Sequence, residues 1–259
     1  SIARYVFAGQ QINAISLPTV LLASRPDLGT MSRFDVPDDV LADQLSALEA
    51  DGWFARLDGV MTGYFATGAQ IDVVANTLSR IRKQNADAVI MVDPVLGDVD
   101  TGLYVGKEVA VAQKDCLISQ ADIITPNLFE LSFLLDQADI KMSDLAPLCQ
   151  TLDVPNIVVT SAAIDQTAND TGGAEICTAL FQQDLTELFH SPYIEEMPKG
   201  TGDVFASYLL SSLVNDSVNL TESDTEKAVG RHVAASVRFM EQVADRVRGS
   251  RTIAPYLLF

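Results

Sequence analysis

Short apolar runs alternate with helix-like patterns along most of this 259-residue chain. Alternation of this kind is typical of βαβ units arranged around a mainly parallel sheet. The pattern therefore predicts an α/β fold. The runs that we expect to form strands are Ala14–Leu17, Gly59–Thr62, Ala88–Val92, Ile123–Thr125 and Ile157–Thr160.

Helical periodicity fills the segments between these runs. In residues 68–84 the apolar side chains recur on one face, and three basic residues near the end suit the negative pole of a helix. The predicted helices are Pro37–Ala50, Gly68–Gln84, Leu128–Leu135, Ser143–Leu152, Gly202–Val214 and Thr221–Val247. An antiparallel pair is expected at Ala174–Phe181 and Leu185–Ser191, with its turn at Gln182, Gln183 and Asp184.

The composition indicates a folded, acidic protein. Apolar residues make up 48% of the chain and the mean hydropathy is +0.19, so a substantial core can be buried. The formal net charge of −18 argues against a nucleic-acid surface, because such a surface clusters Lys and Arg. An acidic protein that binds a nucleotide must offset the repulsion with metal ions, backbone N–H groups or a few basic side chains. Solubility or a salty habitat is the simpler explanation of the acidity.

The cysteines and histidines show no metal-centre pattern. Cys116, Cys149 and Cys177 are far apart and odd in number, which argues against a disulfide framework and for a reducing cytoplasm. We expect them to be small buried hydrophobic residues. The two histidines, His190 and His232, are too few for a His-rich metal site.

Other sequence signals predict one cytoplasmic domain over residues 1–259. No stretch approaches the ~18 uninterrupted apolar residues that a membrane span needs. The first residues of the sequence have no signal-peptide layout. There is also no internal repeat, low-complexity tract or long Pro/Gly linker that would divide the chain.

Polar residues follow several of the predicted strands. In open parallel sheets, ligands bind beyond the carboxyl ends of the strands. The segments to consider are therefore Thr62-Gly63-Tyr64, Asp93 to Asp98, Thr125-Pro126-Asn127 and Thr160-Ser161.

The strongest candidate for chemistry is Gly200-Thr201-Gly202-Asp203 at the start of a predicted helix. The first N–H groups of a helix have no intrahelical partner, and the helix dipole adds positive potential there. Because glycine has no Cβ, a phosphate oxygen could come within hydrogen-bonding distance of the backbone. Asp203, in the first turn, could accept a proton from an attacking hydroxyl group. A helix cap with an acidic first turn explains the segment equally well.

Two carboxylates, Asp93 and Asp98, follow another predicted strand in a loop that contains Pro94 and Gly97. Carboxylates are hard oxygen ligands that suit Mg²⁺, which keeps several waters and bridges to substrate phosphates. The alternative is a turn that uses Asp and Gly for their backbone preferences.

A third segment, 125–130, predicts a helix start. Pro126 ends the strand, Asn127 can cap the helix, and Glu130 occupies the third helical position, which is the pattern of a capping box. Beside the paired aspartates, Asn127 and Glu130 become candidate partners of metal-bound waters or phosphates.

In motif, order and spacing these three segments resemble the ribokinase-like superfamily. The segments Thr62-Gly63-Tyr64 and Leu103-Tyr104-Val105 are similar to its pyridoxal kinase branch, and the resemblance covers roughly residues 57–240. It implies a three-layer α/β/α sandwich with a central, mainly parallel sheet. It also implies ATP-dependent phosphorylation of the 5′-hydroxymethyl group of pyridoxal, pyridoxine or pyridoxamine, in vitamin B6 salvage.

The resemblance further implies a role for each site residue. Asp203 would be the catalytic base, beside an anion hole formed by Gly200, Thr201 and Gly202. Mg²⁺ and its waters would be organised by Asp93, Asp98 and Glu130, with a monovalent cation such as K⁺ nearby. Residues expected to bind ATP are Asp98, Tyr104, Thr125, Asn127, Glu130, Thr160 and Ser161. Residues expected to bind the substrate are Ser1, Val20, Tyr64 and Asp203.

The amino-terminal third departs from the pyridoxal kinase pattern. The first strand of the family is missing and the first helix is too short to cross a sheet, so we expect this region to be incomplete. Two alternatives stay open: a hydroxymethylpyrimidine kinase of the same superfamily, and a vitamer-binding protein without activity. The intact catalytic set argues against the second. The resemblance also implies a homodimer.

Overall fold

The computed structural model describes residues 2–23, 32–165, 174–183, 185–194, 197, 199–217 and 225–249. Ser1, predicted to bind the substrate, lies outside the described residues, as does Asp184 of the predicted turn. The first residues of the predicted helix Thr221–Val247 also lie outside them.

Within the described residues, the central sheet has six strands in the order β10-β9-β8-β7-β4-β3. Four of them run parallel: β3 (Gly59–Thr62), β4 (Val89–Val92), β7 (Ile123–Ile124) and β8 (Asn156–Asp165). An antiparallel hairpin of β9 (Glu175–Phe181) and β10 (Thr186–Pro192) continues the sheet. The mainly parallel α/β architecture is confirmed, together with four predicted strands and the predicted hairpin.

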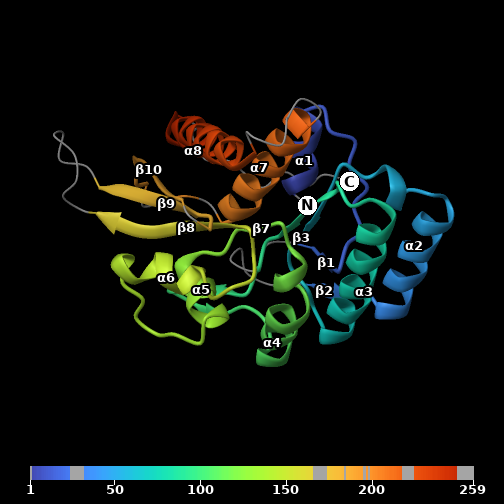
Figure 1. Ribbon diagram of the computed structural model, residues 1–259. Coiled ribbons are helices and arrows are strands. Elements are labelled where there is room, and N and C mark those ends of the chain that lie inside the picture. The colour runs from blue at the N-terminus through green and yellow to red at the C-terminus, as the bar shows by residue number, and fades with distance from the viewer. Residues whose placement is uncertain are drawn as a thin grey trace.

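Helices cover both faces of this sheet (Figure 1). One layer consists of α1 (Ile2–Gly9), α7 (Thr201–Ser217) and α8 (Thr225–Gly249). The other contains α3 (Gly68–Gln84), α4 (Lys107–Cys116), α5 (Leu128–Leu134) and α6 (Leu145–Cys149), while α2 (Asp38–Ala50) packs against α3. None of the helices described here is both long and apolar enough to span a membrane.

The two faces of β4 show why the sheet is covered on both sides. Successive side chains of a strand point to opposite faces. Met91 is buried in the cluster that includes Phe205 of α7, whereas Ile90 and Val92 are buried in the cluster that includes Leu78 of α3. Full burial of such a side chain contributes about 1.5–3 kcal/mol. A strand that is apolar at every position therefore requires a helical layer on each face.

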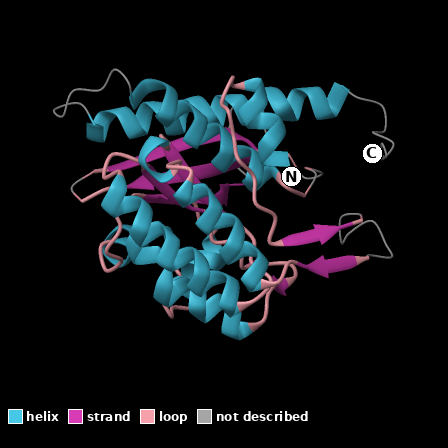
Figure 2. Cartoon of the chain, turned by 90° about the vertical axis from the view of Figure 1, so that its right-hand side faces the viewer, coloured by secondary structure: helices cyan, strands magenta, loops and turns pink. Residues whose placement is uncertain are grey.

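The predicted strand Ala14–Leu17 is wrong. Residues 12–18 form neither helix nor strand, and the side chain of Ile15 is 48% exposed. An apolar run becomes a strand only where it can pair and bury a face, and this segment instead connects α1 to β1 (Val20–Leu22). β1 pairs with β2 (Arg33–Asp35) in a separate two-stranded ribbon, visible beside the helices in Figure 2.

Other elements differ from the prediction in extent. The predicted helix Ser143–Leu152 is a 3-10 turn, Met142–Asp144, followed by the short α6. The sequence pattern also missed α4, whose buried face consists of only Val109, Ala110 and Gln113. Two apolar residues and one glutamine form too narrow an apolar face to give a clear helical periodicity in the sequence.

A buried histidine joins α7 and α8. His232 is 4% exposed, and its Nδ1 lies 2.7 Å from the hydroxyl oxygen of Ser212. Its Nε2 lies 3.5 Å from a carboxylate oxygen of Asp216. Burial lowers the pKa of His232 below the ordinary value of 6.5, although the charge of Asp216 acts in the opposite direction.

We expect His232→Gln to weaken the acid sensitivity of folding. Because the folded-state pKa lies below the unfolded-state value, the unfolded chain binds the proton first as the pH falls. Stability is therefore lost as the pH falls below about 6.5, by about 1.4 kcal/mol for each pH unit over which only the unfolded state is protonated. The measurement is urea unfolding at about pH 7.5 and about pH 5.5 for the wild type and the variant.

His190→Gln is the matched control, since it removes the other histidine of the chain, whose side chain is 53% exposed. The loss of stability that is assigned to His232 should persist in this variant. An identical pH dependence in wild type and His232→Gln would contradict the assignment of this loss to His232.

Candidate active site

The polar segments that follow the parallel strands meet at one edge of the sheet. The amide of Asp93 donates to the carbonyl of Thr62 over 3.1 Å, and the amide of Thr125 donates to that of Val92 over 3.2 Å. The amide of Thr160 donates to the carbonyl of Pro126 over 2.9 Å. These bonds continue the strand pairing beyond the carboxyl ends of the strands, where ligands bind in open sheets of this kind.

Asp93 and Glu130 are both buried carboxyls of this edge, and Asp93 interacts with a neighbouring strand end. Asp93 is 6% exposed and accepts a hydrogen bond of 2.8 Å from the hydroxyl of Thr125. Burial raises the pKa of Asp93 well above its ordinary value, and the charges of Glu130 and Asp203 add to the effect. Three predicted site carboxyls from three different segments are therefore electrostatically coupled.

The Glu130 side chain binds the backbone of two neighbouring segments. Its Oε1 accepts from the amides of Leu96, at 2.9 Å, and Gly97, at 3.3 Å, while its Oε2 accepts from the amide of Asn127 at 2.9 Å. The Asn127 side chain accepts from the Glu130 amide, which confirms the predicted capping box. Burial raises the pKa of Glu130 to about 7, against the effect of these three amides.

Asp98 lies in a hairpin of β5 (Gly97–Asp98) and β6 (Gly102–Leu103). Its Oδ1 accepts from the amides of Asp100 and Thr101 and from the Thr101 hydroxyl. Its Oδ2 accepts from the Tyr104 hydroxyl and, over 2.8 Å, from the Lys199 ammonium. Partial burial acts to raise the pKa of Asp98, but the hydrogen bonds from Lys199, Tyr104 and Thr101 together lower it.

The predicted anion hole lies at the start of α7. Gly200 has φ +98, in the left-handed region that glycine adopts without strain. Gly200 and Gly202 are exposed, and no atom lies within 4 Å of the position that a Cβ would take on either. Asp203 is half-buried in the first turn, and burial raises its pKa. The geometry leaves open access to the helix start, with a carboxyl beside it.

Thr160 and Ser161 lie where β8 is irregular. The register between β8 and β9 shifts between Val159 and Ala163, and Ser161 has φ +52. This irregularity leaves the Ser161 side chain exposed, next to the Thr160 amide that is bonded to Pro126.

Tyr64 and Val20 come together through the β1–β2 ribbon. The Thr19 hydroxyl donates to the Tyr64 carbonyl over 2.6 Å, and the guanidinium of Arg33 lies 5.6 Å from the Tyr64 ring centroid. The buried Gln70 side chain donates to the carbonyls of Thr19 and Val36. The sequence offered no motif for Gln70, yet this residue attaches the ribbon to α3.

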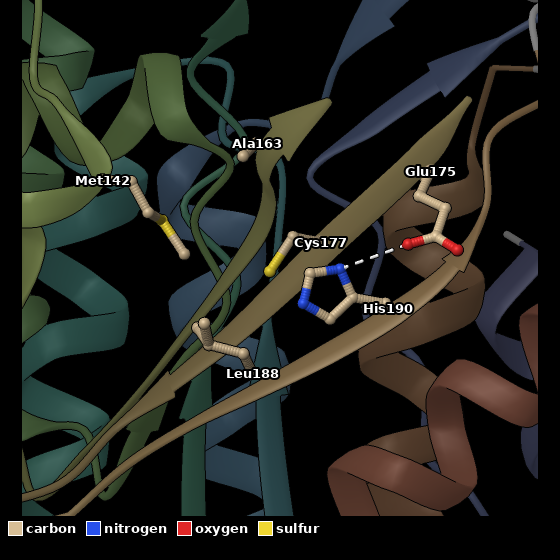
Figure 3. Close-up of a pocket in the computed structure, with 6 residues that line it drawn as sticks. All are labelled: Met142, Ala163, Glu175, Cys177, Leu188 and His190. Atoms are coloured by element: carbon tan, nitrogen blue, oxygen red, sulfur yellow. Dashed lines mark ion pairs between the residues drawn. The ribbon is translucent and has the colours of Figure 1, made fainter. Parts of the chain in front are cut away.

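A separate pocket lies on the β8–β9–β10 side of the molecule and contains none of the predicted site residues (Figure 3). It has a volume of about 170 Å³, and an ion pair of 3.6 Å joins Glu175 and His190 at its wall. Its other lining residues are Met142, Ala163, Cys177 and Leu188.

Among the described residues, no three His, Cys, Asp or Glu side chains form a set that could hold a metal ion by themselves. Mg²⁺ rarely uses such a cage, because one or two carboxylates, waters and substrate phosphates usually suffice. The hard oxygens of Asp93 and Glu130 fit that requirement. Their mutual repulsion, seen in the raised pKa of Asp93, is of the kind that a bound cation offsets.

Comparison with known proteins identifies the family. A family model described as phosphomethylpyrimidine kinase matches residues 5–239. The pyridoxine/pyridoxal/pyridoxamine kinase of Bordetella avium (strain 197N) is 34% identical over 233 residues, which are 87% of this chain and 73% of that protein. The pyridoxine/pyridoxal/pyridoxamine kinase of Bordetella pertussis is 31% identical over 212 residues, which are 81% of this chain and 74% of that protein.

Solved structures agree with this result. The pyridoxal kinase from Leishmania donovani in complex with ADP and pyridoxamine has a TM-score of 0.75 and 25% identity, with 94% of this chain and 81% of that chain covered. The pyridoxal kinase from Entamoeba histolytica has a TM-score of 0.78 and 24% identity, with coverage of 95% and 82%, and shows the same fold.

The fold is that of the ribokinase-like superfamily. The chain belongs to the phosphomethylpyrimidine kinase family, in the group of the pyridoxal kinases.

We expect Gly97→Ala to destabilise the protein. A Cβ at this position would lie 2.2 Å from the carbonyl oxygen of Gly102 and 2.7 Å from a ring carbon of Phe129. The overlap with a backbone oxygen requires β5 and β6 to separate. We therefore expect the free energy of unfolding, measured with urea, to fall by about 1–3 kcal/mol. The loss should be accompanied by weaker hydrogen exchange protection of the Leu96 and Gly97 amides, which Glu130 binds.

Gly68→Ala, in the first turn of α3, is the control, because the nearest atom to its Cβ would be a side-chain carbon at 3.9 Å. This variant should be neutral or slightly stabilising. Equal stability of Gly97→Ala and Gly68→Ala would show that the hairpin does not need the close approach.

Proposed function

We propose that this protein is an ATP-dependent kinase that phosphorylates the 5′-hydroxymethyl group of pyridoxal, pyridoxine or pyridoxamine. The observation that carries the proposal is the position of Asp203, a half-buried carboxyl in the first turn of α7, directly after an exposed glycine turn and coupled to the buried Asp93. The similarity to the Bordetella avium pyridoxine/pyridoxal/pyridoxamine kinase and to the Leishmania donovani pyridoxal kinase supports the choice of substrates.

The reaction would be a direct in-line phosphoryl transfer, in which positioning and charge stabilisation supply most of the acceleration. Asp203 would accept the proton of the attacking hydroxyl group. Burial raises the pKa of Asp203, which makes its carboxylate a better base near neutral pH than an exposed aspartate. No covalent intermediate with the protein is needed.

The amide groups at the start of α7 would bind the transferring phosphoryl group. Gly200, Thr201 and Gly202 place these amides at the positive end of the helix dipole, without a Cβ on either glycine to keep the ligand away. This binding needs no basic side chain, which suits a chain with a net charge of −18.

Asp93 and Glu130 would hold Mg²⁺ and its waters, with Asp98 nearby. When bound, Mg²⁺ supplies positive charge to the phosphate oxygens. The three amides that bind Glu130 keep its carboxylate in place: Oε1 accepts from two of them and Oε2 from one, so Oε2 retains a lone pair.

The other predicted residues would surround the two substrates. The nucleotide would be lined by residues after β7, in the irregular part of β8 and after β6 of the Asp98 hairpin: Thr125, Asn127, Thr160, Ser161 and Tyr104. Tyr64 and Val20, joined through Thr19, would face the pyridine ring. We also propose a homodimer, by analogy with the family.

A second candidate substrate is hydroxymethylpyrimidine, because the matching family model is described as phosphomethylpyrimidine kinase. Both substrates are flat heteroaromatic rings with a hydroxymethyl group. A comparison of turnover on the two compounds distinguishes these candidates.

We expect Asp203→Asn to lower kcat for pyridoxal by about 10²- to 10⁴-fold while ATP binding is largely kept, because the amide cannot accept the hydroxyl proton. The assay is ATP-dependent phosphorylation of pyridoxal and of hydroxymethylpyrimidine at saturating Mg²⁺. Isothermal titration with pyridoxal measures binding separately from turnover.

Asp38→Asn is the matched control, since Asp38 also lies in the first turn of a helix but at the exposed start of α2. It should keep wild-type turnover. Wild-type turnover by Asp203→Asn would remove Asp203 as the base. Turnover of only the pyrimidine would change the substrate, and binding of pyridoxal without turnover of either compound would overturn the kinase proposal.

A further inference from the structure

The Lys199 side chain joins two segments that are far apart in the sequence. Its ammonium donates to Oδ2 of Asp98 over 2.8 Å, across a sequence separation of 101 residues. Asp98 belongs to the β5–β6 hairpin, and Lys199 directly precedes Gly200 at the start of α7. The contact thus joins the Asp98 hairpin to the residue that directly precedes the predicted anion hole.

Asp98 does not depend on this lysine to satisfy its carboxylate. Its two oxygens also accept from the amides of Asp100 and Thr101 and from the hydroxyls of Thr101 and Tyr104. The Lys199 side chain is 54% exposed, and ion pairs of such exposure contribute little to stability. Breaking the Asp98–Lys199 ion pair therefore costs little.

The charge balance of the site favours such an exchange. The buried Asp93 and the nearby Glu130 and Asp203 would all repel the phosphates of a nucleotide, and the backbone amides of α7 carry only partial positive charge. A lysine ammonium is a compact point charge on a flexible stem, well suited to bind a phosphate. The side chain of Lys199 also begins about 3.8 Å, one Cα–Cα step, from Gly200, so a phosphate bound at the adjacent helix start would lie within the range of a flexible lysine.

We infer that Lys199 is a ligand of the nucleotide phosphates, held in position by Asp98 and transferred from the Asp98 carboxylate to a phosphate oxygen when the nucleotide binds. This inference rests on the proposed kinase function and adds a residue that no sequence motif indicated. Asp98 in this role positions the ammonium, and Lys199 offsets charge that the carboxylates of the site would otherwise leave unbalanced.

The test is a comparison of Lys199→Met and Lys199→Arg with the wild type. Methionine keeps the length of the aliphatic chain and removes the charge. We expect Lys199→Met to raise KM for ATP by about 10- to 100-fold, as for loss of a hydrogen bond to a charged group, with KM for pyridoxal within about 2-fold of wild type. Lys199→Arg should restore most of the ATP affinity. Added salt should raise KM for ATP less steeply in Lys199→Met than in wild type.

Lys114→Met is the matched control. Lys114 makes a similar lysine–aspartate ion pair of 2.5 Å, with Asp136, at the end of α4. This variant should leave KM for ATP unchanged. Thermal unfolding of all variants measures the structural contribution of each ion pair.

The outcomes separate the inference from the proposed function. An unchanged KM for ATP in Lys199→Met, with an active wild type, would overturn the role of Lys199 and leave the kinase proposal intact. Parallel losses for ATP and pyridoxal, not restored by arginine, would show a structural contact only. If the wild type has no turnover, the kinase proposal fails, and calorimetric binding of Mg-ATP then tests the role of Lys199. Weaker binding by Lys199→Met than by the wild type supports the phosphate contact. Equal binding or no binding overturns it.

Discussion

The arrangement of the site depends on the carboxylate of Glu130. A single side chain accepts from the amides of Leu96, Gly97 and Asn127, and so fixes the loop after β4 against the start of α5. The side chain of Asn127 adds a bond from its amide group to the carbonyl of Gly97 over 2.8 Å. Because Asp93 and Asp98 lie at the two ends of this loop, their positions follow from the same bonds. Removal of the Glu130 carboxylate would leave buried amides without partners. The free-energy cost of an unpaired buried amide is larger than the net stabilisation from its hydrogen bond.

The second constraint is electrostatic. The charges of Glu130 and Asp203 both act on Asp93, and burial raises the pKa of all three carboxyls. In a chain with a net charge of −18, such a group is expected only where cations are bound or protons are exchanged. A kinase needs both, since a metal offsets phosphate charge and a base accepts the hydroxyl proton. Repulsion among the carboxylates destabilises this edge of the sheet. A bound cation or proton would relieve that repulsion, which is consistent with the proposed chemistry.

The fold supplies the rigid support for these loops. Each central strand is buried on both faces, and its side chains alternate between the α7–α8 layer and the α3–α4 layer. The strand ends therefore have little freedom, and the loops that follow them are held at defined distances. The β1–β2 ribbon is attached differently: Gln70 of α3 binds the carbonyls of Thr19 and Val36 on its two flanks. Tyr64 is thereby linked to the ribbon through Thr19.

Local sequence patterns determined the parts of this protein that depend on near neighbours. The helix periodicity of 68–84, the capping box of Asn127 and Glu130, and the apolar strands at 59–62 and 89–92 are all confirmed. The motifs after the strands also indicated the family. The strand predicted at Ala14–Leu17 failed because periodicity does not reveal whether a sheet edge is available for pairing. The Lys199–Asp98 contact and the bonds of Gln70 join residues 101, 51 and 34 positions apart. Only the tertiary structure decides such contacts, because the partner of a side chain depends on how the layers pack and not on its neighbours in the chain.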